Sequence, residues 1–127
     1  MATETVPEDL RRFILARIPS VPSMEALLLL KGDARREWPL PEIARRLYLP
    51  EKAALETLRA LCEAGIAAPA GEGRYRFEPA TDELRAMVDR LVDRYAHDLI
   101  GVTTLIHSRV GKSAQVFADA FKLRKDD

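Results

Sequence analysis

Apolar residues recur every three or four positions between residues 7 and 18, which predicts a first amphipathic helix. Pro7 suits the first position of this helix, because a proline there gives up a backbone donor that would have no partner. A second helix is expected over about residues 22–31, with Gly32 as its C-terminal cap. Residues 1–6 carry no such pattern and are expected to form a flexible tail.

Two further helices with a sharp break between them are predicted over residues 41–64. A short helix begins at Pro41, and Pro50 interrupts it because the residue before a proline is pushed out of the helical region. Pro50 also suits the start of the next helix, which is expected to cover residues 50–64 and to end at Gly65. The inward-facing side chains of this helix are expected to be Ala54, Leu55, Leu58, Leu61 and Cys62.

A small β-hairpin is predicted over residues 66–77. The segment Gly71-Glu72-Gly73 supplies a turn, and residues 74–77 alternate arginine with an aromatic side chain, which is the period of a half-buried strand. Pro69 restricts the first strand of the pair to an edge position, because proline cannot donate a backbone hydrogen bond. The fold class is therefore mainly α with a small β-hairpin.

One long helix is predicted over roughly residues 82–107, with Thr81 as its N-cap, and a short C-terminal helix follows it. A helix of this length would extend for about 40 Å, which is more than a domain of this size covers alone. We therefore expect its apolar stripe to form a homodimer interface. With two phenylalanines of the C-terminal segment, the expected interface residues are Leu84, Val88, Leu91, Tyr95, Leu99, Val102, Ile106, Phe117 and Phe121.

Composition narrows the class of protein further. The chain has 127 residues, of which 47% are hydrophobic and 31% charged, as in an ordinary globular domain. Its 20 basic and 20 acidic side chains give a formal charge of zero, which argues against a strong polyanion binder that ignores sequence.

Several kinds of site and location receive no support from the sequence. The single cysteine excludes an intrachain disulfide, and no set of residues has metal-ligand spacing, so neither metal nor cofactor is expected. The first residues are acidic, and no apolar run approaches the roughly 20 residues of a membrane span. We expect a cytoplasmic protein without a membrane segment.

The stretch from residue 39 to residue 77, PLPEIARRLYLPEKAALETLRALCEAGIAAPAGEGRYRF, resembles the winged helix-turn-helix superfamily of bacterial transcription regulators. The added flanking helices are similar in arrangement to MarR-type dimeric regulators. The resemblance implies that helix 50–64 enters the DNA major groove and that the hairpin is the wing. It also implies a winged helix-turn-helix domain over residues 7–79 and a helical dimerisation region over residues 80–127.

Candidate DNA-binding residues follow from this resemblance and from the chemistry of base and phosphate recognition. Lysine and arginine bind guanine edges and phosphates, and a glutamate can accept a hydrogen bond from a cytosine amino group. Residues 33–77 carry eight basic and seven acidic side chains. The candidates are Lys52, Glu56, Thr57 and Arg59 on the helix after the turn, Arg45 and Arg46 on the helix before it, and Arg74 and Arg76 on the wing.

Two functions remain open at this level. The first is a DNA-binding transcriptional regulator that acts as a homodimer. The second is a winged-helix module for protein–protein interaction, because Glu56 and Ala60 on the outer helix face also suit a protein partner. No nucleophile–base pair or pair of catalytic carboxylates can be singled out, so an enzyme is not expected. Trp38 and Tyr48 are expected to pack in the core, with an effector pocket as the alternative.

Overall fold

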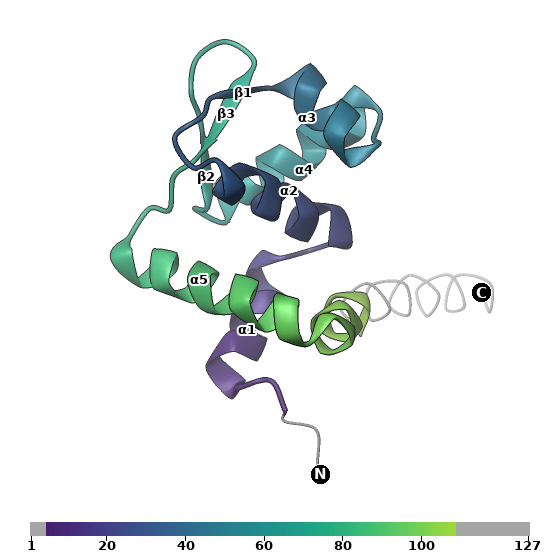
Figure 1. Cartoon of the computed structure of the whole chain (residues 1–127), viewed down its shortest axis with the longest axis vertical. Helices are drawn as coiled ribbons and strands as arrows, with labels where there is room; N and C mark the ends of the chain where they lie inside the picture. Colours follow the sequence, from purple (N-terminus) through teal and green to yellow (C-terminus); the bar gives the residue numbers. More distant parts are fainter. Residues whose placement is uncertain (1–4, 109–127) are drawn as a thin grey trace, which may run out of the picture.

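The computed structural model describes residues 5–108, which form a mainly helical domain with a small antiparallel sheet, as predicted (Figure 1). The predicted C-terminal helix lies outside these residues. The helices are α1 (Glu8–Arg17), α2 (Val21–Gly32), α3 (Leu40–Leu47), α4 (Glu51–Glu63), α5 (Asp82–His97) and a further helix, Leu99–Ser108. The strands are β1 (Trp38–Pro39), β2 (Ala67–Pro69) and β3 (Arg74–Phe77).

Helices α1 and α2 begin where the sequence places helix-start signals. Glu8 and Asp9 lie in the first turn of α1, where carboxylates stabilise the positive end of the helix dipole. The Ser20 hydroxyl caps α2 by accepting a hydrogen bond from the backbone N–H of Ser23 at 3.2 Å. Between residues 5 and 108, no single helix is long and apolar enough to cross a membrane, and α1 with α2 reaches that length only across a bend of 101°.

The pair α3 and α4 forms the predicted helix-turn-helix. Helix α4 agrees with the predicted bounds to within a residue at each end. Its buried face contains Ala54, Leu58 and Leu61, and it contacts α2, α3 and β2. Burial of these side chains holds the helix against the rest of the domain, because removing apolar area from water is the main favourable term in folding.

The sheet has the order β1-β3-β2, with β3 in the centre and antiparallel to both neighbours. Pro69 therefore lies in an edge strand, as predicted. Gly71 and Gly73 shape the hairpin turn with φ angles of 117° and 66°, which glycine adopts at little cost. Strand β1 was not predicted; it pairs Trp38 with Tyr75 across the sheet.

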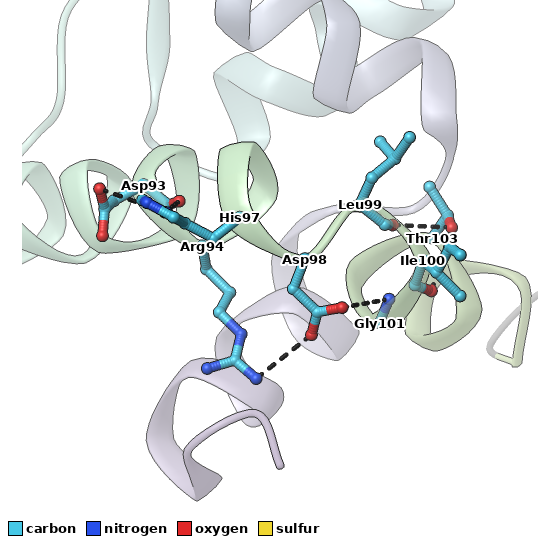
Figure 2. Close-up of polar contacts among 8 residues, drawn as sticks. All are labelled: Asp93, Arg94, His97, Asp98, Leu99, Ile100, Gly101 and Thr103. Atoms are coloured by element: carbon cyan, nitrogen blue, oxygen red, sulfur yellow. Dashed lines mark hydrogen bonds and ion pairs between the residues drawn. The ribbon is translucent and has the colours of Figure 1, made fainter. Parts of the chain in front are cut away.

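The predicted long helix is interrupted, so the prediction of one continuous helix over residues 82–107 was wrong. Helix α5 ends at His97, and Asp98 has the non-helical angles φ −144° and ψ 62° (Figure 2). The Asp98 carboxylate accepts hydrogen bonds from the Gly101 backbone N–H at 3.0 Å and from the Arg94 guanidinium at 3.2 Å. Gly101 leaves room for this carboxylate, because an added Cβ would lie 2.2 Å from Asp98 Oδ2. Asp98 thus caps the helix Leu99–Ser108.

The predicted interface stripe divides between the protomer's own core and its surface. Val88, Leu91, Val102 and Ile106 are buried within the described chain, in the same core cluster as residues of α1, α2, α4 and β3. Leu84 and Tyr95 are partly buried against that core. In contrast, Leu99 is 52% exposed. Phe117 and Phe121 lie outside the described residues, and the dimer itself stays a prediction.

An ion pair joins α1 to α5 at the edge of this core. The Arg90 guanidinium donates hydrogen bonds to both carboxylate oxygens of Asp9, at 2.6 and 3.0 Å. These hydrogen bonds lower the pKa of Asp9 to about 2. The pair therefore links two helices that are far apart in the sequence.

We expect Asp9→Asn to lower Tm near neutral pH and to have no effect below about pH 2. The folded-state pKa of Asp9 lies below its ordinary value of 3.8, so the unfolded chain binds more protons between these two values. The stability from this carboxylate is fully present above 3.8 and is lost as the pH falls through about 2. Calorimetry across this pH range tests it, with Asp33→Asn as the control, since Asp33 is exposed and has no ion pair between residues 5 and 108. A Tm difference that does not change with pH would contradict the prediction.

Candidate nucleic-acid interface

The turn before α4 and the β2–β3 hairpin, which belong to the elements predicted to contact DNA, lie on the same side of the molecule (Figure 1). Figure 1 shows the α3–α4 connection and the β2–β3 hairpin on the side away from α1 and α5. The buried stripe of α4 faces the domain, so its opposite face is turned to solvent. Lys52, Glu56 and Arg59 are exposed on that face, as predicted.

Thr57 is the exception on α4, and the prediction that it lies on the outer face was wrong. Its side chain is buried, with the residue 9% exposed, and its hydroxyl donates a hydrogen bond to the Ala53 carbonyl oxygen at 2.8 Å. Position 57 is turned toward the connection between α1 and α2, where Pro19 and Ser20 lie beside it. A packed threonine of this kind has no hydroxyl hydrogen to spare for a base edge.

Two arginines near α3 share one carboxylate. Arg36 donates a hydrogen bond to Glu42 at 2.5 Å, and Arg46 lies 3.7 Å from the other oxygen of the same side chain. The hydrogen bond from Arg36 lowers the pKa of Glu42. Both guanidinium groups also lie over the ring of Trp38, at 3.9 and 5.5 Å from its centroid. Trp38 itself is buried, as expected.

The wing arginines are held by a second carboxylate. Arg74 and Arg76 lie 3.9 and 3.7 Å from the two oxygens of Glu37, and Arg76 also pairs with Glu78 at 2.6 Å. Glu37 directly precedes β1, whose pairing with β3 brings it beside the wing. Glu37 was missed as a partner of the wing arginines because β1 was not predicted. Glu42 was also missed, although it precedes Arg46 by one helical turn on α3, a spacing that favours an ion pair.

Three other basic side chains on this side of the molecule have no such partner. Arg45, Lys52 and Arg59 are exposed, and none of them forms an ion pair within residues 5–108. The predicted cations therefore fall into two groups. Arg46, Arg74 and Arg76 are paired with carboxylates, whereas Arg45, Lys52 and Arg59 are open to an incoming anion.

Tyr48 is placed differently from the prediction that it packs in the core. It is 94% exposed and ends α3 in the left-handed conformation, with φ 57° and ψ 43°. It therefore stands in the turn of the helix-turn-helix, next to the start of α4. Among residues 5–108, no group of three or more histidine, cysteine, aspartate or glutamate side chains could hold a metal ion.

Comparison with known proteins defines the class of fold. No protein-family model matches the sequence, and no curated protein is similar to it. The structure is similar to the crystal structure of Sco5413, a MarR family transcriptional regulator from Streptomyces coelicolor, with a TM-score of 0.56 and 20% sequence identity. The match covers 93% of this chain and 81% of that chain. The chain therefore has the winged-helix fold of a MarR-type regulator, which confirms the predicted resemblance at the level of the fold.

Proposed function

We propose that the protein is a DNA-binding transcriptional regulator that acts as a homodimer. The observation that carries this proposal is the placement of the α3–α4 connection and the β2–β3 hairpin on the side of the molecule away from α1 and α5 (Figure 1), together with the exposed side chains of Lys52, Glu56 and Arg59 on α4. A helix for the major groove and a β-ribbon for the flanking backbone are the two parts that such a reader needs.

The exposed side chains of α3, α4 and the wing bind different parts of the DNA. Lys52 and Arg59 on α4 bind base edges or phosphates, and Glu56 accepts a hydrogen bond from a cytosine amino group. Arg45, with Arg46, binds phosphate beside the groove, and the wing arginines bind the adjacent backbone. Thr57 is left out of this interface, since its hydroxyl is satisfied by the Ala53 carbonyl.

The carboxylates near the wing set the strength of nonspecific binding. A phosphate that engages Arg74 or Arg76 must displace Glu37, which lies beside both. The side chains of these ion pairs are partly exposed, and exposed pairs are weak, so a phosphate can take the place of the carboxylate. The pairs thereby reserve the wing cations for a correctly docked duplex, in a chain whose formal charge is zero.

The homodimer is supported by the apolar side chains at the start of the last described helix. Leu99 and Ile100 are 52% and 77% exposed, whereas Val102 and Ile106 on the same helix are buried. Covering these exposed side chains with a second copy removes apolar area from water. A two-fold dimer would present two recognition helices to half-sites about 34–36 Å apart.

A groove beside α4 favours a protein partner as a second candidate function. It has a volume of about 430 Å³, lies between the end of α1 and α4, and is lined by Ala16, Arg17, Pro19, Ala60, Glu63 and Ala64. A groove that mixes small apolar side chains with the Glu63 carboxylate suits a protein segment better than a phosphate backbone, because the carboxylate repels phosphate. In this function, the winged helix would bind protein and little or no DNA.

Fluorescence anisotropy on labelled duplex DNA tests the regulator directly. The probes are a duplex that wild-type protein selects from a randomised pool and an unrelated duplex, each titrated across a salt series. We expect the double variant Arg74→Ala with Arg76→Ala to weaken binding to both duplexes and to reduce the salt slope by about four, because the dimer loses two arginines from each protomer and each arginine neutralises one phosphate.

The matched control removes two exposed arginines from the other end of the molecule, in Arg11→Ala with Arg12→Ala on α1. This control is expected to leave both affinity and slope unchanged. If wild-type protein binds no duplex even at low salt, DNA binding is overturned and the protein-partner function takes its place.

Glu37→Gln is expected to tighten DNA binding roughly threefold, which corresponds to about 0.6 kcal/mol. The reason is that the substitution removes the carboxylate that competes with phosphate for both wing arginines. The same anisotropy titration measures this, with Glu83→Gln on α5 as the control for charge alone, since Glu83 is exposed and forms no ion pair between residues 5 and 108. Equal gains in both variants would mean that overall charge, and not the ion pairs of Glu37, limits the affinity.

Ile100→Lys is expected to convert a dimer into a monomer in sedimentation equilibrium, because it places a charge where we propose an apolar interface. Wild-type protein should sediment with twice the mass of the chain. Ala86→Lys adds the same charge at an exposed position on α5 and should remain a dimer. A wild-type protein that stays monomeric at high concentration would exclude the homodimer without excluding DNA binding.

A further inference from the structure

A single exposed aromatic side chain stands in the turn between α3 and α4. Tyr48 is 94% exposed, whereas the nearby Trp38 is 4% exposed. Within the described part of the chain, the other large exposed hydrophobic residues, Leu99 and Ile100, lie on the last helix. The Tyr48 hydroxyl also makes no hydrogen bond with residues 5–108.

The backbone at this position disfavours tyrosine. Tyr48 is the non-glycine residue with a positive φ among those described, and its angles of 57° and 43° lie in the left-handed region. A Cβ in this region approaches the following carbonyl oxygen, and a helix end of this shape usually carries glycine or asparagine. The hydrogen bonds of the turn come from the backbone alone, from Tyr48 N to Arg45 O at 3.3 Å and from Leu49 N to Ala44 O at 2.9 Å. Asparagine would make the same turn with less strain.

Neither the conformation of the turn nor the burial of apolar area therefore accounts for a tyrosine at position 48. We infer that Tyr48 contacts the DNA backbone, with its hydroxyl donating a hydrogen bond to a phosphate oxygen at the edge of the major groove that α4 enters. This inference rests on the proposed function and adds a residue to it. Strained backbone at an exposed turn is found where the side chain serves a binding site.

The charges beside Tyr48 favour a phosphate as its partner. Arg45 precedes it by three residues on α3, and Lys52 follows it by four on the first turn of α4. Both side chains are exposed and form no ion pair within residues 5–108. A hydroxyl donor that is flanked in the sequence by two unpaired cations is a set of groups that proteins use to position a phosphate backbone.

A tyrosine contact of this kind has a signature that separates it from a lysine or arginine contact. The phenol is uncharged, so its hydrogen bond releases no counterion and leaves the salt dependence of binding unchanged. A contact to phosphate also carries no sequence information, so its removal weakens binding to every duplex by the same factor.

The test measures the binding of full-length Tyr48→Phe and Tyr48→Asn to two duplexes of about 30 base pairs, long enough for two half-sites one helical turn apart. One duplex is selected from a randomised pool by wild-type protein, and the other is unrelated in sequence. We expect each variant to lose at least about fivefold in affinity for both duplexes, with an unchanged salt slope. Ala86→Asn, at an exposed position on α5, serves as the control and should bind as wild type does.

Thermal unfolding distinguishes the removal of a DNA contact from damage to the fold. Tyr48→Asn relieves the strain at the turn, so its Tm should equal or exceed that of wild type while its affinity falls. Wild-type binding together with variants whose affinities stay within about twofold would overturn the inference and leave the proposed function standing. A loss of affinity confined to the selected duplex would also overturn it, because that result indicates a base contact. If wild type binds neither duplex, the proposed function fails and the inference fails with it.

Discussion

The burial of one face of α4 is the interaction on which the rest of the structure depends. Leu58 and Leu61 are fully buried, and the helix that carries them contacts α2, α3 and β2. The same packing therefore fixes the angle of the helix-turn-helix and the position of the wing. Because a well-packed core resists small displacements, the outer face of α4 is presented as a rigid surface. The exposed side chains of α4 are thus placed by residues that are themselves buried.

Electrostatics supply a second layer of organisation on this surface. A chain with zero formal charge can still bind a polyanion if its basic side chains lie at one end. These basic side chains must then either lie away from carboxylates or form ion pairs that a phosphate can displace. The protein does both. Arg45 and Lys52 are left open, whereas Glu37 and Glu42 hold other arginines through weak, partly exposed pairs. Under the proposed function, this arrangement would keep the affinity for random DNA low while a docked duplex would still gain the paired cations.

Local signals in the sequence were sufficient for much of the fold. Helix α4 and the hairpin follow from apolar spacing, prolines and the glycine turn, so both were predicted with nearly correct bounds. Strand β1 could not be predicted, because two residues carry no period and its pairing depends on a distant strand. The partners of the wing arginines were missed for the same reason. Thr57 and Tyr48 were misplaced because a helical pattern gives the side of a residue only approximately, and a turn residue has no pattern at all.

The break at Asp98 changes how the end of the described chain can vary. In a continuous helix, inserting or deleting one residue rotates all the following side chains by about 100° around the helix axis. The buried residues of the two halves would then no longer face the same side. Here Val88 and Leu91 anchor α5, while Val102 and Ile106 anchor the next helix separately. The buried residues of each helix fix separately which of its faces points toward the core. The segment that carries Leu99 and Ile100 can therefore diverge in length and sequence without disturbing the helix that packs on α1.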